Sequence, residues 1–192
     1  MVTEHLAYQL LASYGKDKEI TTALENFDFY ILPIVNPDDA PETAALARHM
    51  RRVKERQGLK LFVDWHAFGQ LVMYRHTCKS SSRLPSKHPL PRLARRIAAA
   101  MNSVYNNPYK TGTACEVLYP TTGSAEDYAW DVVGATYSFT IELPPRTHQE
   151  GKKGKTGFHL PKVQIARAGE EAFEGVREMM RFIVNEDNCK EE

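Results

Sequence analysis

The chain has 192 residues, of which 42% are hydrophobic and 26% charged, with 25 Lys+Arg against 24 Asp+Glu. These proportions are typical of a globular protein, and the length predicts one domain over residues 1–192. A net charge of +1 gives no electrostatic reason to expect nucleic acid or an anionic membrane as a partner, since both attract excess positive charge. No apolar stretch approaches the roughly 20 residues of a membrane helix, and the first residues lack the pattern of a secretory signal.

The first third of the chain predicts helices around two buried strands. The expected elements are a capped helix from Thr3 to Gly15, a short turn at 20–27, a strand at 29–35, a helix at 41–57 and a strand at 60–66. Strand, helix and strand within about 40 residues are typical of a parallel or mixed sheet that carries helices on its faces.

The rest of the chain continues this alternation. We expect strands at 69–74 and 135–142, an extended segment at 115–118, helices at 93–105, 124–133 and 166–184, and loops at 75–91 and 144–156. The sequence therefore predicts an α/β fold, with a mixed and mostly parallel sheet flanked by helices.

Several familiar catalytic motifs are absent from the sequence. A Gly-Lys-Thr at 154–156 lacks the glycine that a phosphate-binding loop needs at position 149, which is Gln149, so we interpret it as a solvated loop. No G-x-S-x-G or HExxH motif is present. The three cysteines form no CxxC pair; Cys78 and Cys115 are compatible with a disulfide or with free thiols.

Two polar residues stand at the ends of predicted apolar strands, His66 and Glu142. Strands of α/β sheets bring their carboxyl ends to the edge at which ligands bind. There a histidine can bind a metal ion, and a glutamate can act as a general base. The alternatives are a structural histidine and a paired surface carboxylate.

The local sequences around these two residues resemble the zinc carboxypeptidases of the carboxypeptidase A and B type. The most specific segments are Asp-Trp-His-Ala-Phe-Gly-Gln at 64–70 and Tyr-Ser-Phe-Thr-Ile-Glu-Leu at 137–143. Segments 29–38, 61–74, 118–130 and 157–161 also match in order and approximate spacing. The resemblance thus covers nearly the whole chain and implies a carboxypeptidase-like, incomplete fold.

The resemblance also implies roles for individual residues. His66 matches a zinc ligand, and Glu142 matches the carboxylate that takes a proton from water and passes it to the departing amine. Tyr119 matches a tyrosine that closes over the substrate. Glu126 lies at, or one residue from, the base of the side-chain pocket, where an acid favours C-terminal Lys or Arg; Asp127 is the neighbouring candidate. The alternative for Glu126 is an acid in the first turn of a helix.

Further expectations follow from the family. Zinc is the implied cofactor, the C-termini of peptides or proteins are the implied partners, and the implied setting is extracellular or vacuolar. Phe158 resembles an aromatic lining residue, with plain packing as the alternative, and the resemblance favours a bridge between Cys78 and Cys115.

The sequence also departs from the family pattern at two places. The family takes two more zinc ligands from an HxxE segment upstream of the helix that begins here at Thr3, and the sequence does not contain that segment. A stretch with the arginines and asparagine that grip the substrate carboxylate is expected after Asp38, where Asp39 runs directly into Ala40. Low hydrolytic activity is therefore expected. The alternatives are a non-catalytic peptide-binding relative and the product of an incomplete gene model.

Overall fold

The computed structural model describes residues 2–33, 40–75, 84, 88–120, 123–144, 158 and 160–188. Its helices are α1 (Val2–Ser13), α2 (Lys18–Asn26), α3 (Ala40–Gln57), α4 (Pro89–Tyr105), α5 (Ala114–Val117), α6 (Ala125–Asp127), the π-helix η2 (Tyr128–Val133) and α7 (Lys162–Asn188). Its strands are β1 (Leu61–Ala67), β2 (Leu71–Tyr74), β3 (Lys110–Thr113) and β4 (Tyr137–Leu143). Among these described helices, none is long and apolar enough to cross a bilayer.

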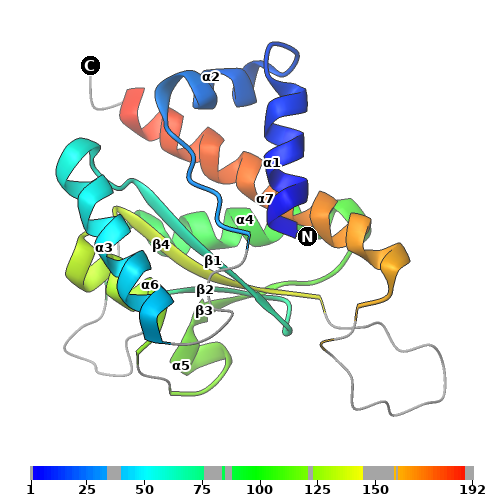
Figure 1. Ribbon diagram of the computed structural model, residues 1–192. Coiled ribbons are helices and arrows are strands. Elements are labelled where there is room, and N and C mark those ends of the chain that lie inside the picture. Colours follow the sequence, from blue (N-terminus) through cyan, green and yellow to red (C-terminus); the bar gives the residue numbers. More distant parts are fainter. Residues whose placement is uncertain are drawn as a thin grey trace.

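The four described strands form one mixed sheet in the order β1-β4-β2-β3 (Figure 1). Strands β1 and β4 are parallel, β2 and β3 are parallel, and β2 runs antiparallel to β4. Strand β4 is therefore hydrogen-bonded on both sides, whereas β1 lies at one edge. This arrangement confirms the predicted mixed, mostly parallel sheet.

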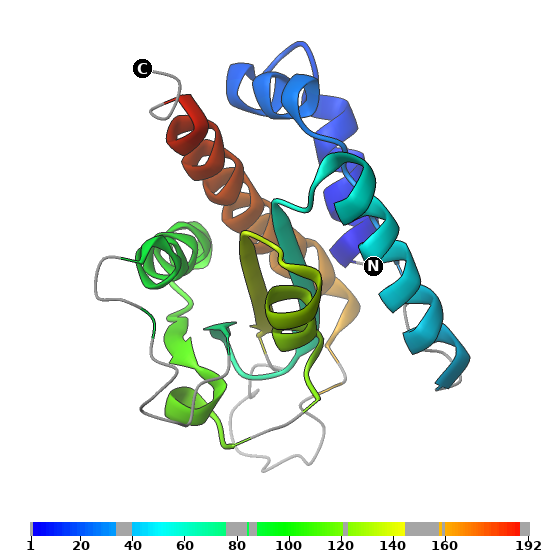
Figure 2. The ribbon, with the colours of Figure 1, turned by 90° about the vertical axis from the view of Figure 1, so that its left-hand side faces the viewer.

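The main core lies between one face of the sheet and the helices α4 and α7. Alternate side chains point to opposite faces of a strand, and Tyr137, Phe139 and Ile141 of β4 all enter this core. Helices α4 and α7 pack on each other, and α1 and α2 lie on the other side of α7 (Figure 2). Helices α4 and α7 thus contribute most of the buried residues of this core.

The opposite face of the sheet is only partly covered by apolar side chains. Phe62 of β1 packs against a second cluster from α3 and η2, which includes Met50, Ala129 and Val133. The other side chains of β1 and β4 that point to this face are polar, and they alternate with the core residues. They form a polar strip of Asp64, His66, Ser138, Thr140 and Glu142 on the face opposite the main core.

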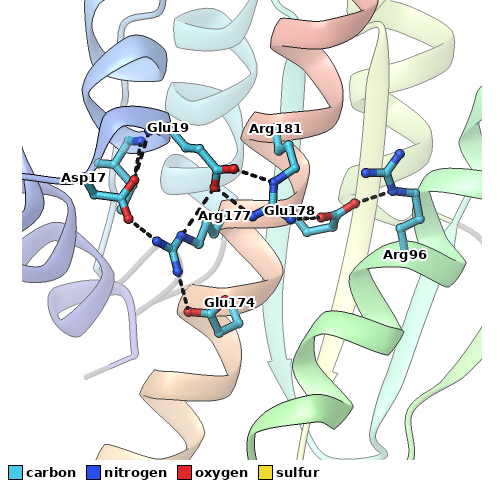
Figure 3. Close-up of polar contacts among 8 residues, drawn as sticks. Asp17, Glu19, Arg96, Glu174, Arg177, Glu178 and Arg181 are labelled. Carbon is cyan, nitrogen blue, oxygen red and sulfur yellow. Dashed lines mark hydrogen bonds and ion pairs between the residues drawn. The ribbon is translucent and has the colours of Figure 1, made fainter.

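An ionic network joins α2, α7 and α4 (Figure 3). Asp17 caps α2 and pairs with Arg177. Glu19 accepts hydrogen bonds from Nε and Nη2 of Arg181 at 2.8 and 2.7 Å. The hydrogen bond from Arg181 lowers the pKa of Glu19. The buried Glu178 extends the network by accepting from Arg181 and from Arg96. These contacts fix the direction of α2 against α7.

Two sequence predictions of extended structure are wrong. Residues 29–33 form no strand, and the rest of the predicted strand at 29–35 lies outside the described residues. Phe29 and Ile31 pack instead against the cluster of α1, α2 and α7, and no described strand pairs with them. Residues 115–118 are mostly helical because the carboxylate of Glu116 accepts the main-chain N–H of Thr113 at 2.9 Å and caps α5. Strand β3 was not predicted, since its sequence, Lys-Thr-Gly-Thr, is short and polar.

The start of α4 predicts a pH-dependent stability. His88 is the N-cap of α4, and its Nδ1 accepts the main-chain N–H of Leu90 at 3.2 Å. Burial lowers the pKa of His88, with the nearby Arg75 acting in the same direction and Glu186 against it. The imidazole of His88 therefore binds a proton more tightly in the unfolded chain than in the folded protein. The free energy of unfolding thus falls as the pH drops below the ordinary histidine pKa of about 6.5.

We expect urea unfolding to detect this loss against the variant His88→Asn, which keeps a capping side chain and cannot titrate. The wild type should lose up to about 1 kcal/mol relative to the variant between about pH 8 and pH 5. Parallel pH profiles of the two proteins would contradict the capping role of the neutral imidazole.

Candidate active site

His66 and Glu142 lie side by side at the carboxyl ends of two parallel strands. The two residues are register partners in the ladder between β1 and β4. Neighbouring strands lie about 4.8 Å apart, and paired residues share one face of a sheet. Both side chains therefore belong to the polar strip, on the face opposite the main core. The strand-end positions predicted from the sequence thus meet in space.

Asp64 holds the imidazole of His66. It lies two residues earlier on β1, on the same face, and its Oδ2 is 3.0 Å from Nε2 of His66. The side chain of His66 is 51% exposed. The hydrogen bond to Asp64 raises the pKa of His66, and the negative charges of Asp64, Glu142 and Glu126 add to the effect against the opposing effect of burial. The imidazole thus stands in an acidic environment.

Glu142 differs from Asp64 in having no hydrogen bond to His66 among the described residues. Its Oε2 atom is buried and makes no hydrogen bond. Burial raises the pKa of Glu142, although the neighbouring His66 opposes the shift. A half-buried carboxyl group with a raised pKa is a better proton acceptor than an exposed one, which suits a general base that later acts as an acid.

Glu126 lies beneath the same strip. Its side chain is only 4% exposed, and its Oε2 accepts a hydrogen bond of 2.8 Å from Thr140, the register partner of Asp64. Ser138 donates a second bond of 2.8 Å to the main-chain oxygen of Glu126 and fastens α6 to β4. No cation lies within ion-pair distance of Glu126 among the residues that the structure describes. Glu126 thus lies in the first turn of α6, as the alternative expected, and its carboxylate is buried beneath the strip.

The structure does not bring the other predicted residues into this group. Tyr119 is 60% exposed and makes no polar or ring contact with described residues. Phe158 packs edge-on against Phe68, with ring centroids 5.0 Å apart. Cys115 is disulfide-bonded, while Cys78 lies outside the described residues, so their predicted pairing stays a prediction.

Asp64 and Thr140 were missed by the sequence reasoning. Each lies two positions before a predicted site residue, His66 or Glu142, and so on the same face of its strand. The two-residue period of a strand was the signal that could have found them. Asp64 forms part of the matched segment at 64–70, but no role was assigned to it.

A comparison with protein families now identifies the class. The family model described as zinc carboxypeptidase matches residues 1–38 and 39–175. The chain belongs to the zinc carboxypeptidase family. The match divides between Asp38 and Asp39, the point at which the sequence predicts a missing stretch.

Individual relatives agree with this assignment. The chain is 29% identical over 241 residues to metallocarboxypeptidase A of Trichophyton tonsurans, covering 96% of this chain and 56% of the relative. It is 26% identical over 231 residues to carboxypeptidase A4 of Mus musculus, covering 92% and 53%. The chain thus spans about half the length of the curated relatives that it matches.

Solved structures show the same fold. A crystal structure of thrombin activatable fibrinolysis inhibitor superposes with a TM-score of 0.76 at 25% identity, covering 96% of this chain and 58% of the other. The bovine form, solved in complex with tick carboxypeptidase inhibitor, has a TM-score of 0.64 at 30% identity and covers 78% and 47%. The carboxypeptidase-like fold is therefore confirmed for the part that the chain spans.

The family implies zinc, and the described residues do not by themselves fit a zinc site. A catalytic zinc ion ordinarily takes three protein ligands. Among the described residues, no group of three or more His, Cys, Asp or Glu side chains is placed to share an ion. His66 is the one predicted ligand, and its Nε2 is engaged by Asp64. The described residues alone therefore support no chemical step that a bound metal ion would carry out.

Proposed function

We propose that this protein acts on the C-terminal residue of peptides and hydrolyses the last peptide bond, as a partial carboxypeptidase-like catalytic domain over residues 1–192. The observation that carries the proposal is the in-register pair of His66 and Glu142 at the ends of β1 and β4. Glu142 is the proposed proton-transfer residue. His66 is the proposed zinc ligand among the described residues.

The proposed substrates end in Lys or Arg. Glu126 is a buried carboxylate with one hydroxyl partner on the strip and no cation beside it in the described residues. Burial of a charge is costly unless an opposite charge compensates it, so a cationic side chain is the fitting ligand. Tyr119, exposed on the segment before α6, is the proposed contact to the substrate's terminal carboxylate.

We also propose an extracellular or vacuolar setting. The disulfide-bonded state of Cys115 supports it, because disulfides persist mainly in oxidising compartments.

The test is hydrolysis of short peptides ending in Lys, Arg, Phe or Leu by the 192-residue chain with added zinc. We expect slow release of C-terminal Lys and Arg, since the described residues offer a single zinc ligand. Glu142→Gln should abolish this release and leave peptide binding within about threefold, because it removes the proton acceptor and keeps the side-chain shape. Unchanged hydrolysis by the variant would contradict the role of Glu142.

Two further outcomes would overturn the hydrolytic proposal. Peptide binding without turnover, insensitive to chelators, would show a non-catalytic peptide-binding protein. If none of the tested peptides binds, peptides are not the substrates of this protein.

A further inference from the structure

Two carboxylates lie beside the imidazole of His66, and only one of them is hydrogen-bonded to it. Asp64 is on the same strand and lies 3.0 Å from Nε2 through its Oδ2. Glu142 is on the neighbouring strand, and its buried Oε2 makes no hydrogen bond. The imidazole is therefore held from its own strand, and it makes no hydrogen bond with Glu142 in the part of the chain that the structure describes.

Strand geometry explains why Asp64 is able to do this. Residues two apart on a strand point to the same face about 6.5–7 Å apart along the chain, so a short aspartate can reach the outer ring nitrogen of a histidine. The register partner of Asp64 is Thr140, whose hydroxyl is directed to Glu126 at 2.8 Å. Thr140 therefore donates to Glu126, and Asp64 remains available to His66.

We propose that Asp64 is a positioning residue that holds the ring of His66 by Nε2, so that Nδ1 keeps the free lone pair. A carboxylate partner on one ring nitrogen selects the tautomer and the ring orientation of a histidine. Nδ1 makes no hydrogen bond within the described part of the chain. The contact between Asp64 and His66 is given by the structure, and its role in the reaction rests on the proposed function.

The proposal predicts which ring nitrogen reacts. The side chain of His66 is 51% exposed, so a small alkylating reagent reaches it. Iodoacetamide attacks the nitrogen with the free lone pair, and the two carbamoylmethyl isomers of histidine are separated by chromatography after isolation of the peptide that contains His66. We expect the wild type to react mainly at Nδ1, measured above the titration midpoint of His66.

Substitutions of Asp64 should move the site of reaction. Asp64→Ala frees Nε2 and should shift the isomer ratio toward Nε2 by at least about tenfold, a change of the size that one hydrogen bond to a charged group confers. Asp64→Asn retains an acceptor oxygen and should keep most of the wild-type preference. Asp64→Ser, whose hydroxyl is too short to reach the ring, replaces Asp64→Ala if the alanine variant does not fold, as judged by circular dichroism.

The outcomes separate this role from the proposed function. An isomer ratio unchanged by Asp64→Ala, or by Asp64→Ser where that variant replaces it, would overturn the positioning role. A wild type that reacts mainly at Nε2 would overturn it as well. A shifted ratio in a chain that releases no C-terminal residue would support the positioning role while overturning the proposed hydrolysis.

Discussion

Peptides ending in Lys or Arg are expected to bind the variant Glu126→Gln about 10- to 100-fold more weakly than the wild type, while peptides ending in Leu lose less than about threefold. A hydrogen bond to a charged group contributes about 1.5–3 kcal/mol. The carboxylate of Glu126 is 4% exposed and bonded to Thr140 at 2.8 Å. Glutamine keeps an oxygen for Thr140 and removes only the charge.

Asp127→Asn is the matched control for this prediction. Asp127 is the adjacent residue of α6, and the sequence left the choice between the two acids open. Isothermal titration with C-terminal Lys, Arg and Leu peptides measures both variants. A loss confined to Asp127→Asn would assign the pocket to that residue, and an equal loss for Lys and Leu peptides would show that Glu126 acts through folding.

Phe139→Ala should have the largest effect on stability, about 3–5 kcal/mol. Phe139 is completely buried in the main core. It sits in the middle of β4, with Val63 and Tyr74 as register partners on the two sides. Truncation therefore opens a cavity that strands on both sides prevent from closing. The loss is a large part of the usual total of about 5–15 kcal/mol.

Urea unfolding followed by circular dichroism measures this loss. Leu11→Ala is the control, because Leu11 is 77% exposed on α1 and should change stability by less than about 0.5 kcal/mol. Phe139→Leu should fall between the two, since it removes less volume. Equal midpoints for Phe139→Ala and Leu11→Ala would mean that the core does not unfold cooperatively with the sheet.

The site residues that could be predicted from the sequence are those whose position depends on a single strand. His66 and Glu142 stand out because polar residues that follow apolar strands are delivered to a sheet edge. Their pairing, and the contact of Asp64 with His66, depend on the register between β1 and β4, which no local pattern states. Glu126 was found by resemblance alone, because its burial depends on Ser138 and Thr140 of a distant strand.

The fold shows the same division. Apolar periodicity predicted α3 to within one residue, since the helix buries a stripe of its own sequence. It also predicted the middle of α4 and α7, but both helices begin four residues earlier than expected, and residues 89–91 belong to α4 rather than to the predicted loop at 75–91. The predicted strand at 29–35 failed because strand formation needs a neighbour to complete its hydrogen bonds. Its described residues have β-forming side chains and no strand beside them. A single sequence records the propensity of a segment but not the presence of its partner.

The position of β1 has a consequence for handling the isolated chain. Natural edge strands are usually blunted by lysine, proline or a bulge, and Leu61–Ala67 contains none of these residues. In the described sheet, the outer side of β1 has no strand to satisfy its N–H and C=O groups. An edge strand of this kind can form backbone hydrogen bonds with another extended chain. Association through this edge would use backbone hydrogen bonds, which the near-neutral net charge of the chain does little to oppose.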